Sequence, residues 1–256
     1  MNLQRHEAIL NLMEKQNIMS IKELAAQLGC TEMTVRRNLD EMQAKGLVKR
    51  SHGFASLERS GRHTDYYEEI HENAEEKKAI AREAYALIRP GMSICLDSGT
   101  TVQQLVELLG DDLPLSVITP SLVAAMTLSS RPQIQVMMPG GFLHHGNRSL
   151  LVDESDRLVS RYHADIAFLS CRSFQLPGGT FEHSQTLTNT KRALASLAEK
   201  KILLLDHSKW NVSSIFNCIP LESLDILITG PEAPAQSVDR ARELGLEVIV
   251  AGCGEG

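Results

Sequence analysis

The chain has 256 residues, a formal net charge of −6 and a pI near 5.9. This length allows one small and one medium-sized domain, each with its own core. No apolar run approaches the roughly 20 residues of a membrane-spanning helix, and no signal-peptide pattern precedes the first amphipathic segment. We therefore expect a cytoplasmic protein without a membrane partner.

The five cysteines form no C-x-x-C pair and have no metal-ligand spacing to histidine. Most stand in apolar surroundings, which is typical of small core residues in a reducing compartment. We expect neither a metal site nor another cofactor.

The segment from Ser20 to Gly53 carries the signals of a helix-turn-helix. Ser20 with Glu23 three residues later predicts a capping box. The helix that follows has one apolar face with i, i+3, i+4, i+7 spacing, made of Ile21, Leu24, Ala25 and Leu28. Gly29-Cys30 makes the turn, and Thr31 caps a second helix whose inward face is Val35, Leu39 and Met42.

The outer face of the second helix is suited to DNA. Arg37 lies two positions, roughly 200°, around the helix from Val35, so it points away from the core. The second helix of such a motif enters the major groove. Leu47 to Gly53 reads as a short β-hairpin wing with positive charge for a phosphate backbone. The expected DNA contacts are Thr31, Thr34, Arg36, Arg37, Asn38, Lys49, Arg50 and His52. A helical hairpin with merely solvated arginines is the alternative.

The charge is unevenly divided along the chain. Residues 1–62 hold 10 Lys and Arg against 7 Asp and Glu, a net charge of +3. Since the whole chain has a net charge of −6, residues 63–256 have a net charge of −9. This asymmetry indicates a DNA-binding domain attached to a larger acidic body.

After the winged domain, expected over residues 1–57, the pattern changes. Residues 58–74 have no sustained apolar period and read as a linker, with a short ordered piece around Tyr66-Tyr67. Residues 75–256 alternate helical segments with short apolar runs, which predicts an open, mainly parallel α/β sheet. The expected strands are Met92–Leu96, Leu115–Thr119, Ile134–Met138, Asp165–Leu169, Ile202–Asp206, Asp225–Thr229 and Glu247–Ala251.

The sequence Asp97-Ser98-Gly99-Thr100-Thr101 follows the first expected strand and precedes a helix. Ligands of open α/β sheets bind at the carboxyl ends of strands, and a helix N-terminus suits a phosphate. Gly99 allows close backbone approach, and the neighbouring hydroxyls are donors. We favour an anion site over the alternative that Ser98 or Thr100 simply caps the helix.

Other strand ends can converge on the same crevice. They are Thr119-Pro120-Ser121, Pro139-Gly140-Gly141 and Asp206-His207-Ser208-Lys209. Lys209 is a candidate phosphate partner, and so is Lys191, at the expected start of an alanine-rich helix. The glycines leave space for a ligand or a tight turn.

Together these motifs resemble the DeoR family of bacterial sugar-metabolism regulators over nearly the whole chain. The matching segments are Thr34–Leu39, Gly46–Gly53, Glu76-Lys77, Leu96–Thr101, Thr119–Ser121, Gly140-Gly141, Lys191-Arg192 and Asp206–Lys209. The resemblance implies a winged helix-turn-helix followed by a sensor domain similar to ribose-5-phosphate isomerase. It also implies phosphorylated-sugar effectors and an oligomeric repressor.

The chain departs from the family pattern at three places. Pro120 replaces a common asparagine, Ser170–Ser173 replaces a Gly-Ala-Asp/Asn-Gly segment, and Asn189-Thr190 replaces an acidic residue. The related isomerases need carboxylates in this region for proton transfer, which favours a regulator without catalysis. Arg172 instead adds a cation near the expected sugar site.

We therefore expect a repressor of a carbohydrate-utilisation operon, a homo-oligomer (dimer or tetramer) that a phosphorylated sugar releases from operator DNA. The expected effector contacts are Asp97, Ser98, Gly99, Thr100, Thr101, Thr119, Ser121, Gly140, Gly141, Arg172, Lys191 and Lys209. One alternative is a sugar-phosphate isomerase with an accessory DNA-binding domain. Another is a DNA-binding protein whose second domain serves only assembly.

Overall fold

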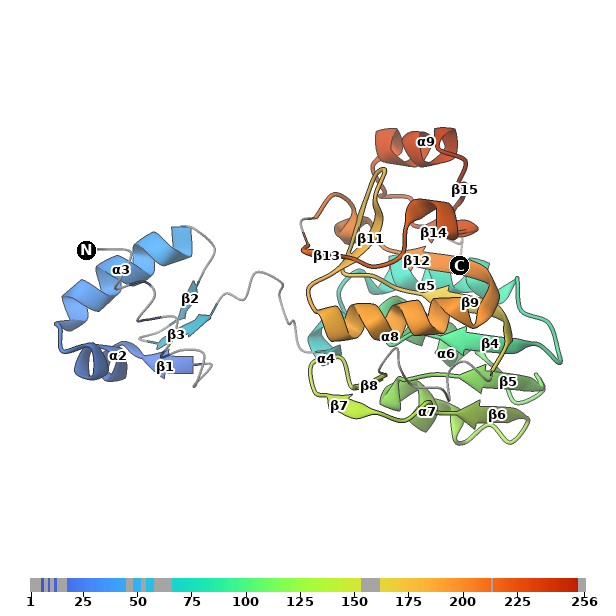
Figure 1. The fold of residues 1–256 in the computed structure, drawn as a ribbon, viewed down its shortest axis with the longest axis horizontal. Coiled ribbons are helices and arrows are strands. Elements are labelled where there is room, and N and C mark those ends of the chain that lie inside the picture. The colour runs from blue at the N-terminus through green and yellow to red at the C-terminus, as the bar shows by residue number, and fades with distance from the viewer. Residues whose placement is uncertain are drawn as a thin grey trace. The chain divides into compact units, whose positions relative to one another are not determined.

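The computed structural model describes residues 6, 9, 12, 18–44, 48–51, 54–57, 66–152, 162–212 and 214–252. The chain divides into two units, residues 1–63 and residues 64–256 (Figure 1). Among the described residues, none of the helices is both long and apolar enough to cross a lipid bilayer.

The first unit is a winged helix-turn-helix. Its elements are β1 (Ile18–Ser20), α2 (Ile21–Leu28), α3 (Glu32–Ala44), β2 (Val48–Ser51) and β3 (Phe54–Leu57). The strands form an antiparallel sheet in the order β1-β3-β2. The predicted wing is therefore present as β2 and β3, and β1 adds a strand that the sequence pattern did not indicate.

Local chemistry sets the helix ends of this unit as predicted. Ser20 Oγ accepts the Glu23 amide at 3.1 Å, and Glu23 Oε2 accepts the Ser20 amide at 2.9 Å, which completes the capping box. Gly29 ends α2 with φ of 61°, a left-handed conformation that favours glycine. Thr31 Oγ1 accepts the Thr34 amide at 3.2 Å at the start of α3. The predicted inward faces of both helices form the buried core of the unit.

The second unit is built on a seven-stranded parallel sheet in the order β15-β14-β12-β9-β4-β5-β6. These strands are β4 (Ser93–Leu96), β5 (Leu115–Ile118), β6 (Ile134–Met137), β9 (Ala164–Leu169), β12 (Ala198–Leu205), β14 (Ile226–Thr229) and β15 (Glu247–Val250). All seven predicted strands are present, and β12 starts four residues earlier than predicted, at Ala198.

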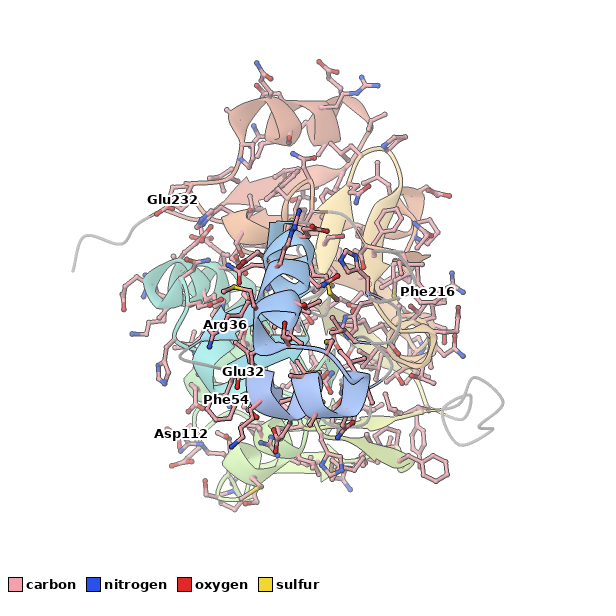
Figure 2. All side chains as sticks on the ribbon, turned by 90° about the vertical axis from the view of Figure 1, so that its left-hand side faces the viewer. Glu32, Arg36, Phe54, Asp112, Phe216 and Glu232 are labelled. Atoms are coloured by element: carbon pink, nitrogen blue, oxygen red, sulfur yellow. The ribbon has the colours of Figure 1, made fainter. Side chains whose placement is uncertain are left out.

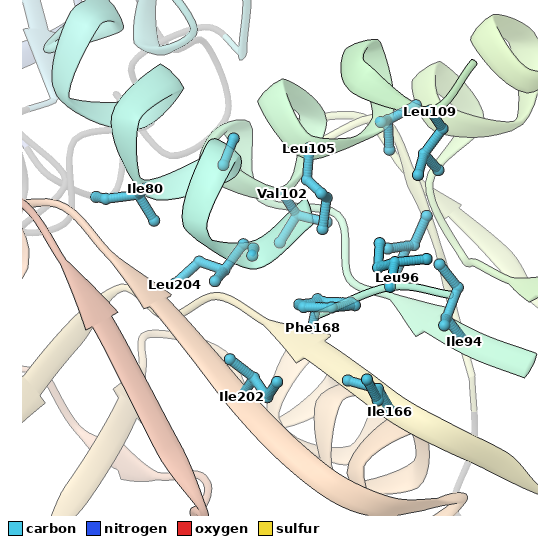
Figure 3. Close-up of a cluster of buried hydrophobic side chains, with 14 of the residues drawn as sticks. Ile80, Ile94, Leu96, Val102, Leu105, Leu109, Ile166, Phe168, Ile202 and Leu204 are labelled. Atoms are coloured by element: carbon cyan, nitrogen blue, oxygen red, sulfur yellow. The ribbon is translucent and has the colours of Figure 1, made fainter. Parts of the chain in front are cut away.

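Helices cover both faces of this sheet. They are α4 (Tyr66–Glu69), α5 (Ala74–Tyr85), α6 (Thr100–Leu108), α7 (Leu122–Leu128), α8 (Gln185–Ser196) and α9 (Ala235–Glu243), with short 3-10 turns η2 (His207–Lys209) and η3 (Leu221–Ser223). Ile94 and Leu96 belong to a core cluster with residues of α5 and α6 (Figure 3). Cys95 between them belongs to the cluster on the other face, which includes residues of α8 and α9. The unit is therefore a three-layer α/β/α sandwich.

Two small antiparallel additions flank the main sheet. One is the hairpin of β7 (Phe142–His144) and β8 (Ser149–Leu151). The other joins β10 (Ser173–Gln175), β11 (Gly179–Glu182) and β13 (Phe216–Asn217). The second addition follows directly on the loop after β9.

The short ordered piece expected around Tyr66-Tyr67 is α4, whose Tyr66 is only 3% exposed, and α5 begins at Ala74, one residue before the expected start. One predicted helix start differs in the structure. The helix expected to start at Lys191 begins at Gln185, and within it Thr188 and Thr190 donate their hydroxyls to carbonyls four residues back. This threonine-rich turn hides the helical pattern in the sequence.

Candidate functional site

The strand order places a topological switch point between β4 and β9. From β4 the sheet grows through β5 to β6 on one side, and from β9 through β12 to β15 on the other. Ligands of open α/β sheets bind in the crevice outside such a point. The loop of Asp97 follows β4 and the loop of Ser170 follows β9, so both lie at this crevice.

A buried ion pair ties these loops together. Asp97 is 2% exposed, and its Oδ2 accepts the Ser170 amide at 2.9 Å and the Ser170 hydroxyl at 2.6 Å. Lys191 of α8 donates to the same oxygen and to the Ser170 carbonyl at 2.9 Å. Burial alone raises the pKa of Asp97, but Lys191 and Ser170 outweigh it and hold that pKa below its usual value.

Sequence reasoning missed a third member of this network, Glu182. Its Oε1 lies 3.4 Å from Lys191 Nζ and accepts the Arg172 amide at 3.1 Å. Burial raises the pKa of Glu182. Lys191 lowers that pKa, but by less, so the pKa of Glu182 stays above its usual value. Burial also works against the charged form of Lys191, but Asp97 and Glu182 raise its pKa above the usual range. We expected no carboxylate on the 170–173 loop, and this one comes from β11 instead.

The helix that follows Asp97 has no side-chain cap, and its first residues, Thr100 and Thr101, are 6% and 5% exposed. Gly99 is the N-cap of α6, and no side chain caps the helix, so the alternative role of Ser98 or Thr100 as a cap is not what the structure shows. Ser98 Oγ accepts the Asn147 side-chain amide at 3.1 Å. A Cβ at Gly99 would lie 2.3 Å from the Ser170 side chain, so the glycine makes room for the neighbouring loop.

The remaining loop residues shape the crevice from one side. Thr119 Oγ1 accepts the Ser121 amide at 3.1 Å, and Ser121 Oγ caps α7 through the Ala124 amide at 3.1 Å. A Cβ at Gly141, whose φ is 113°, would lie 2.1 Å from the Leu151 carbonyl oxygen. Gly140 has φ of 81°. Gly141 therefore permits close approach to the Leu151 backbone, whereas a Cβ at Gly140 would meet nothing within 4 Å.

The predicted cations occupy different places. Lys191 is buried against two carboxylates, whereas Lys209 lies at the carboxyl end of β12 with 14% of its side chain exposed. Lys209 Nζ donates to Glu69 Oε1 at 2.5 Å. Arg172, on the loop after β9, is partly exposed and is near enough to Glu69 to lower the pKa of that carboxyl.

The loop of Lys209 is held by the first turn of α5. Glu76 Oε1 accepts the His207 amide at 2.9 Å, and Glu76 Oε2 lies 2.6 Å from His207 Nδ1. Glu76, Asp206 and His207 each offer one atom that could bind a metal ion, and these atoms lie within 4.8 Å of one another. Lys209 and Lys77 lower the pKa of Asp206 against the effect of burial, so cations of the chain already neutralise it. We assign this group to holding the loop.

The outer face of α3 presents the predicted arginines. The side chain of Arg37 is 86% exposed and that of Arg36 is 45% exposed, with Glu32 3.7 Å from Arg36 (Figure 2). Lys49 and Arg50 belong to β2 of the wing. His52 lies outside the described residues.

One predicted DNA contact is wrong. Asn38 is 4% exposed, and its side-chain amide donates to the Thr34 carbonyl at 2.7 Å. It lies three residues after Val35, on the same inward face, so the helical period of α3 already indicates its burial. Two exposed apolar side chains were missed instead, Met33 on α3 at 77% and Phe54 on the wing at 51%.

Comparison with known proteins agrees with both units. The model of the DeoR-like helix-turn-helix domain matches residues 5–60, and the model of the DeoR C-terminal sensor domain matches residues 72–231. The chain belongs to the DeoR family. It is therefore a DNA-binding transcriptional regulator with a winged helix-turn-helix and an α/β sensor domain.

Relatives in the DeoR family extend over nearly the full chain. The regulator is 31% identical to the HTH-type transcriptional regulator GolR of Listeria innocua, over 97% of this chain and 98% of that protein. It is 28% identical to a putative aga operon transcriptional repressor of Escherichia coli O157:H7, over 97% and 94%. It is 27% identical to the glycerol-3-phosphate regulon repressor of Escherichia coli K12, over 90% and 92%.

Among solved structures, the chain is similar to ribose 5-phosphate isomerase A of Methanocaldococcus jannaschii, with a TM-score of 0.41 and 21% identity over 54% of this chain and 55% of that one. A transcriptional regulator from Streptococcus pneumoniae has a TM-score of 0.41 and 13% identity over 66% of this chain and 85% of that one.

The buried pair makes a stability prediction. Asp97→Ala leaves Lys191 without its closest partner, and breaking a buried ion pair in this way costs about 3–5 kcal/mol. Urea unfolding should show this loss for Asp97→Ala and a change below about 0.5 kcal/mol for the exposed Asp112→Ala. Equal stability of the two variants would contradict the proposed role of the pair.

We predict different roles in DNA binding for Arg37 of α3 and Lys49 of the wing. Arg37→Ala should abolish preference for the operator over unrelated DNA, because arginine contacts to guanine contribute about 1–3 kcal/mol of discrimination. Lys49→Ala should weaken both DNAs about equally, since phosphate contacts carry no sequence information. Titration of both DNAs at fixed salt measures this. An unchanged operator preference in Arg37→Ala overturns the assignment of Arg37.

Proposed function

We propose that this regulator represses a carbohydrate-utilisation operon and that a phosphorylated sugar, or a related phosphorylated metabolite, releases it from operator DNA. Its relatives include proteins named as repressors of an aga operon and of a glycerol-3-phosphate regulon. The observation that carries the proposal is the N-terminus of α6, which has no side-chain cap and lies at the switch point, with Arg172 on the loop after β9 and Lys209 on the loop after β12. This arrangement suits a phosphate group.

We propose distinct roles for the charged residues. The Ser98 amide already donates to Asp97 Oδ1 at 2.7 Å, so the phosphate binds at the amides of residues 99–101 and the neighbouring hydroxyls, with Lys209 as its countercharge. Lys191 is already neutralised by Asp97 and Glu182, so it orders the loops. Arg172 meets the part of the ligand that varies among relatives, which favours a ligand with a second anionic or strongly polar group.

We further propose that the regulator acts as a homo-oligomer, a dimer or a tetramer. Paired half-sites in operator DNA require two DNA-binding units at a fixed spacing. An effector that changes the arrangement of subunits changes that spacing, and operator affinity falls as a result. The effector must therefore bind the two arrangements unequally.

The effector proposal is tested by titrating a panel of sugar phosphates while operator binding is followed. One member should lower operator affinity by roughly 5- to 150-fold, the usual range of coupling between two sites. Thr100→Ala and Lys209→Ala should abolish this response, and Lys200→Ala, at the opposite end of β12, should keep it. A response that survives both site variants places the ligand elsewhere.

The same panel separates sensing from assembly alone. A ligand at 100 times its dissociation constant stabilises the folded protein by about 2.7 kcal/mol. We expect such a shift in thermal unfolding for the active compound. If no phosphorylated compound shifts the transition, the second unit serves assembly only.

We also propose that the site binds without turnover. The alternative of a sugar-phosphate isomerase needs a carboxylate that is free to take a proton from carbon. Asp97 is held by Lys191 and Ser170, and Glu182 is buried against Lys191. Pentose and hexose phosphates should therefore show no aldose–ketose interconversion. Turnover that is lost in Glu182→Gln or Asp97→Ala would establish the enzyme instead.

A further inference from the structure

Lys209, the proposed countercharge of the effector, already has an anionic partner from its own chain. Its Nζ lies 2.5 Å from Glu69 Oε1. The two side chains are 14% and 24% exposed, so the pair sits at the rim of the crevice and is not sealed in the core. The carboxylate of Glu69 is therefore paired with Lys209, the cation that we assign to the phosphate of the effector.

Glu69 lies within a group of cations. Burial by itself raises the pKa of Glu69, but Lys209, Lys77 and Arg172 together bring that pKa below its usual value. Two of these cations, Lys209 and Arg172, are the ones that we assign to the effector. Lys77 is 1% exposed and donates to the Glu69 backbone carbonyl at 2.6 Å. The α4 segment is thus held by the same charges that a ligand anion would use.

The position of α4 in the chain gives this contact a consequence. It is the first described helix of the sensor unit, and only eight residues separate it from β3 of the DNA-binding unit. Among the described side chains of α4, the buried Tyr66 and the bonded Glu69 hold it to the rest of the unit. A four-residue helix has little stability of its own, so loss of the Glu69 contacts will loosen it.

We propose that Glu69 is an internal competitor for the anionic group of the effector, so that ligand binding on Lys209 releases α4. This inference rests on the proposed effector site. A phosphate carries a charge of about −1.5 to −2 near neutral pH and cannot share Lys209 with a carboxylate without repulsion. By reciprocity, the closed Glu69 contact lowers ligand affinity by the same factor by which the ligand opens it.

The test uses the full-length protein with inorganic phosphate as the probe. Glu69→Gln removes the competing charge with almost no change in shape, and it should bind phosphate about tenfold more tightly than the wild type. Glu72→Gln, an exposed carboxylate three residues later, should bind like the wild type. Lys209→Ala should lose the binding in every background.

Hydrogen exchange on the wild-type chain gives a second readout that needs no variant. Phosphate should accelerate amide exchange in residues 66–73 about tenfold and leave α9 unchanged. Lys209-dependent binding with unchanged affinity in Glu69→Gln, or with unchanged exchange in residues 66–73, overturns the competitor and leaves the effector site standing. Phosphate binding that is absent, or that does not depend on Lys209, overturns the effector site itself.

Discussion

The architecture of the sensor unit depends on the buried ion pair between Asp97 and Lys191. Asp97 follows β4, Lys191 lies in the middle of α8, and both bond to Ser170 after β9. Three segments far apart in sequence thereby take fixed positions around the switch point of the sheet. A buried pair of this kind contributes little net stability, but it forbids arrangements in which either charge is left alone. Its main effect is to specify where the loops lie.

The ion pairs at this edge of the sheet differ in how deeply they are buried. Lys191 is enclosed by Asp97 and Glu182, whereas Lys209 meets Glu69 at the rim. Exchanging a partner in the buried network would leave a charge without solvent or counterion, which costs several kcal/mol. Exchange at the partly exposed rim is far cheaper, because water supports the separated charges. An anionic ligand therefore replaces Glu69 more readily than it replaces Asp97.

Much of the fold could be predicted from the sequence because its signals are local. The capping box of α2, the inward face of α3 and the apolar runs of the parallel strands all lie within a few residues of one another. The same helical period places Asn38 on the buried face of α3. The prediction that Asn38 contacts DNA was wrong because it did not take this period into account. The start of α8 was missed for a different reason, since its first turns are rich in threonine, a β-branched residue with low helix propensity.

The candidate site was predictable in its outline and not in its pairings. Asp97, Gly99 and Lys209 follow strands, so the topology rule brings their loops together. Which charge meets which is decided by contacts between residues that are 94 positions apart for Asp97 and Lys191 and 140 apart for Glu69 and Lys209. Such pairs leave no pattern in a single sequence. Glu182 and Glu69 stand in short elements without any motif, so only the three-dimensional arrangement shows their roles.

The most direct test of the account is a crystal structure of the full-length regulator with a sugar phosphate that releases its operator. The account predicts the phosphate at the amides of residues 99–101 and at Lys209 Nζ, with the Asp97–Lys191 pair intact and Glu69 displaced. A phosphate bound to Lys191 with Asp97 displaced, or a ligand away from the ends of β4, β9 and β12, would contradict it.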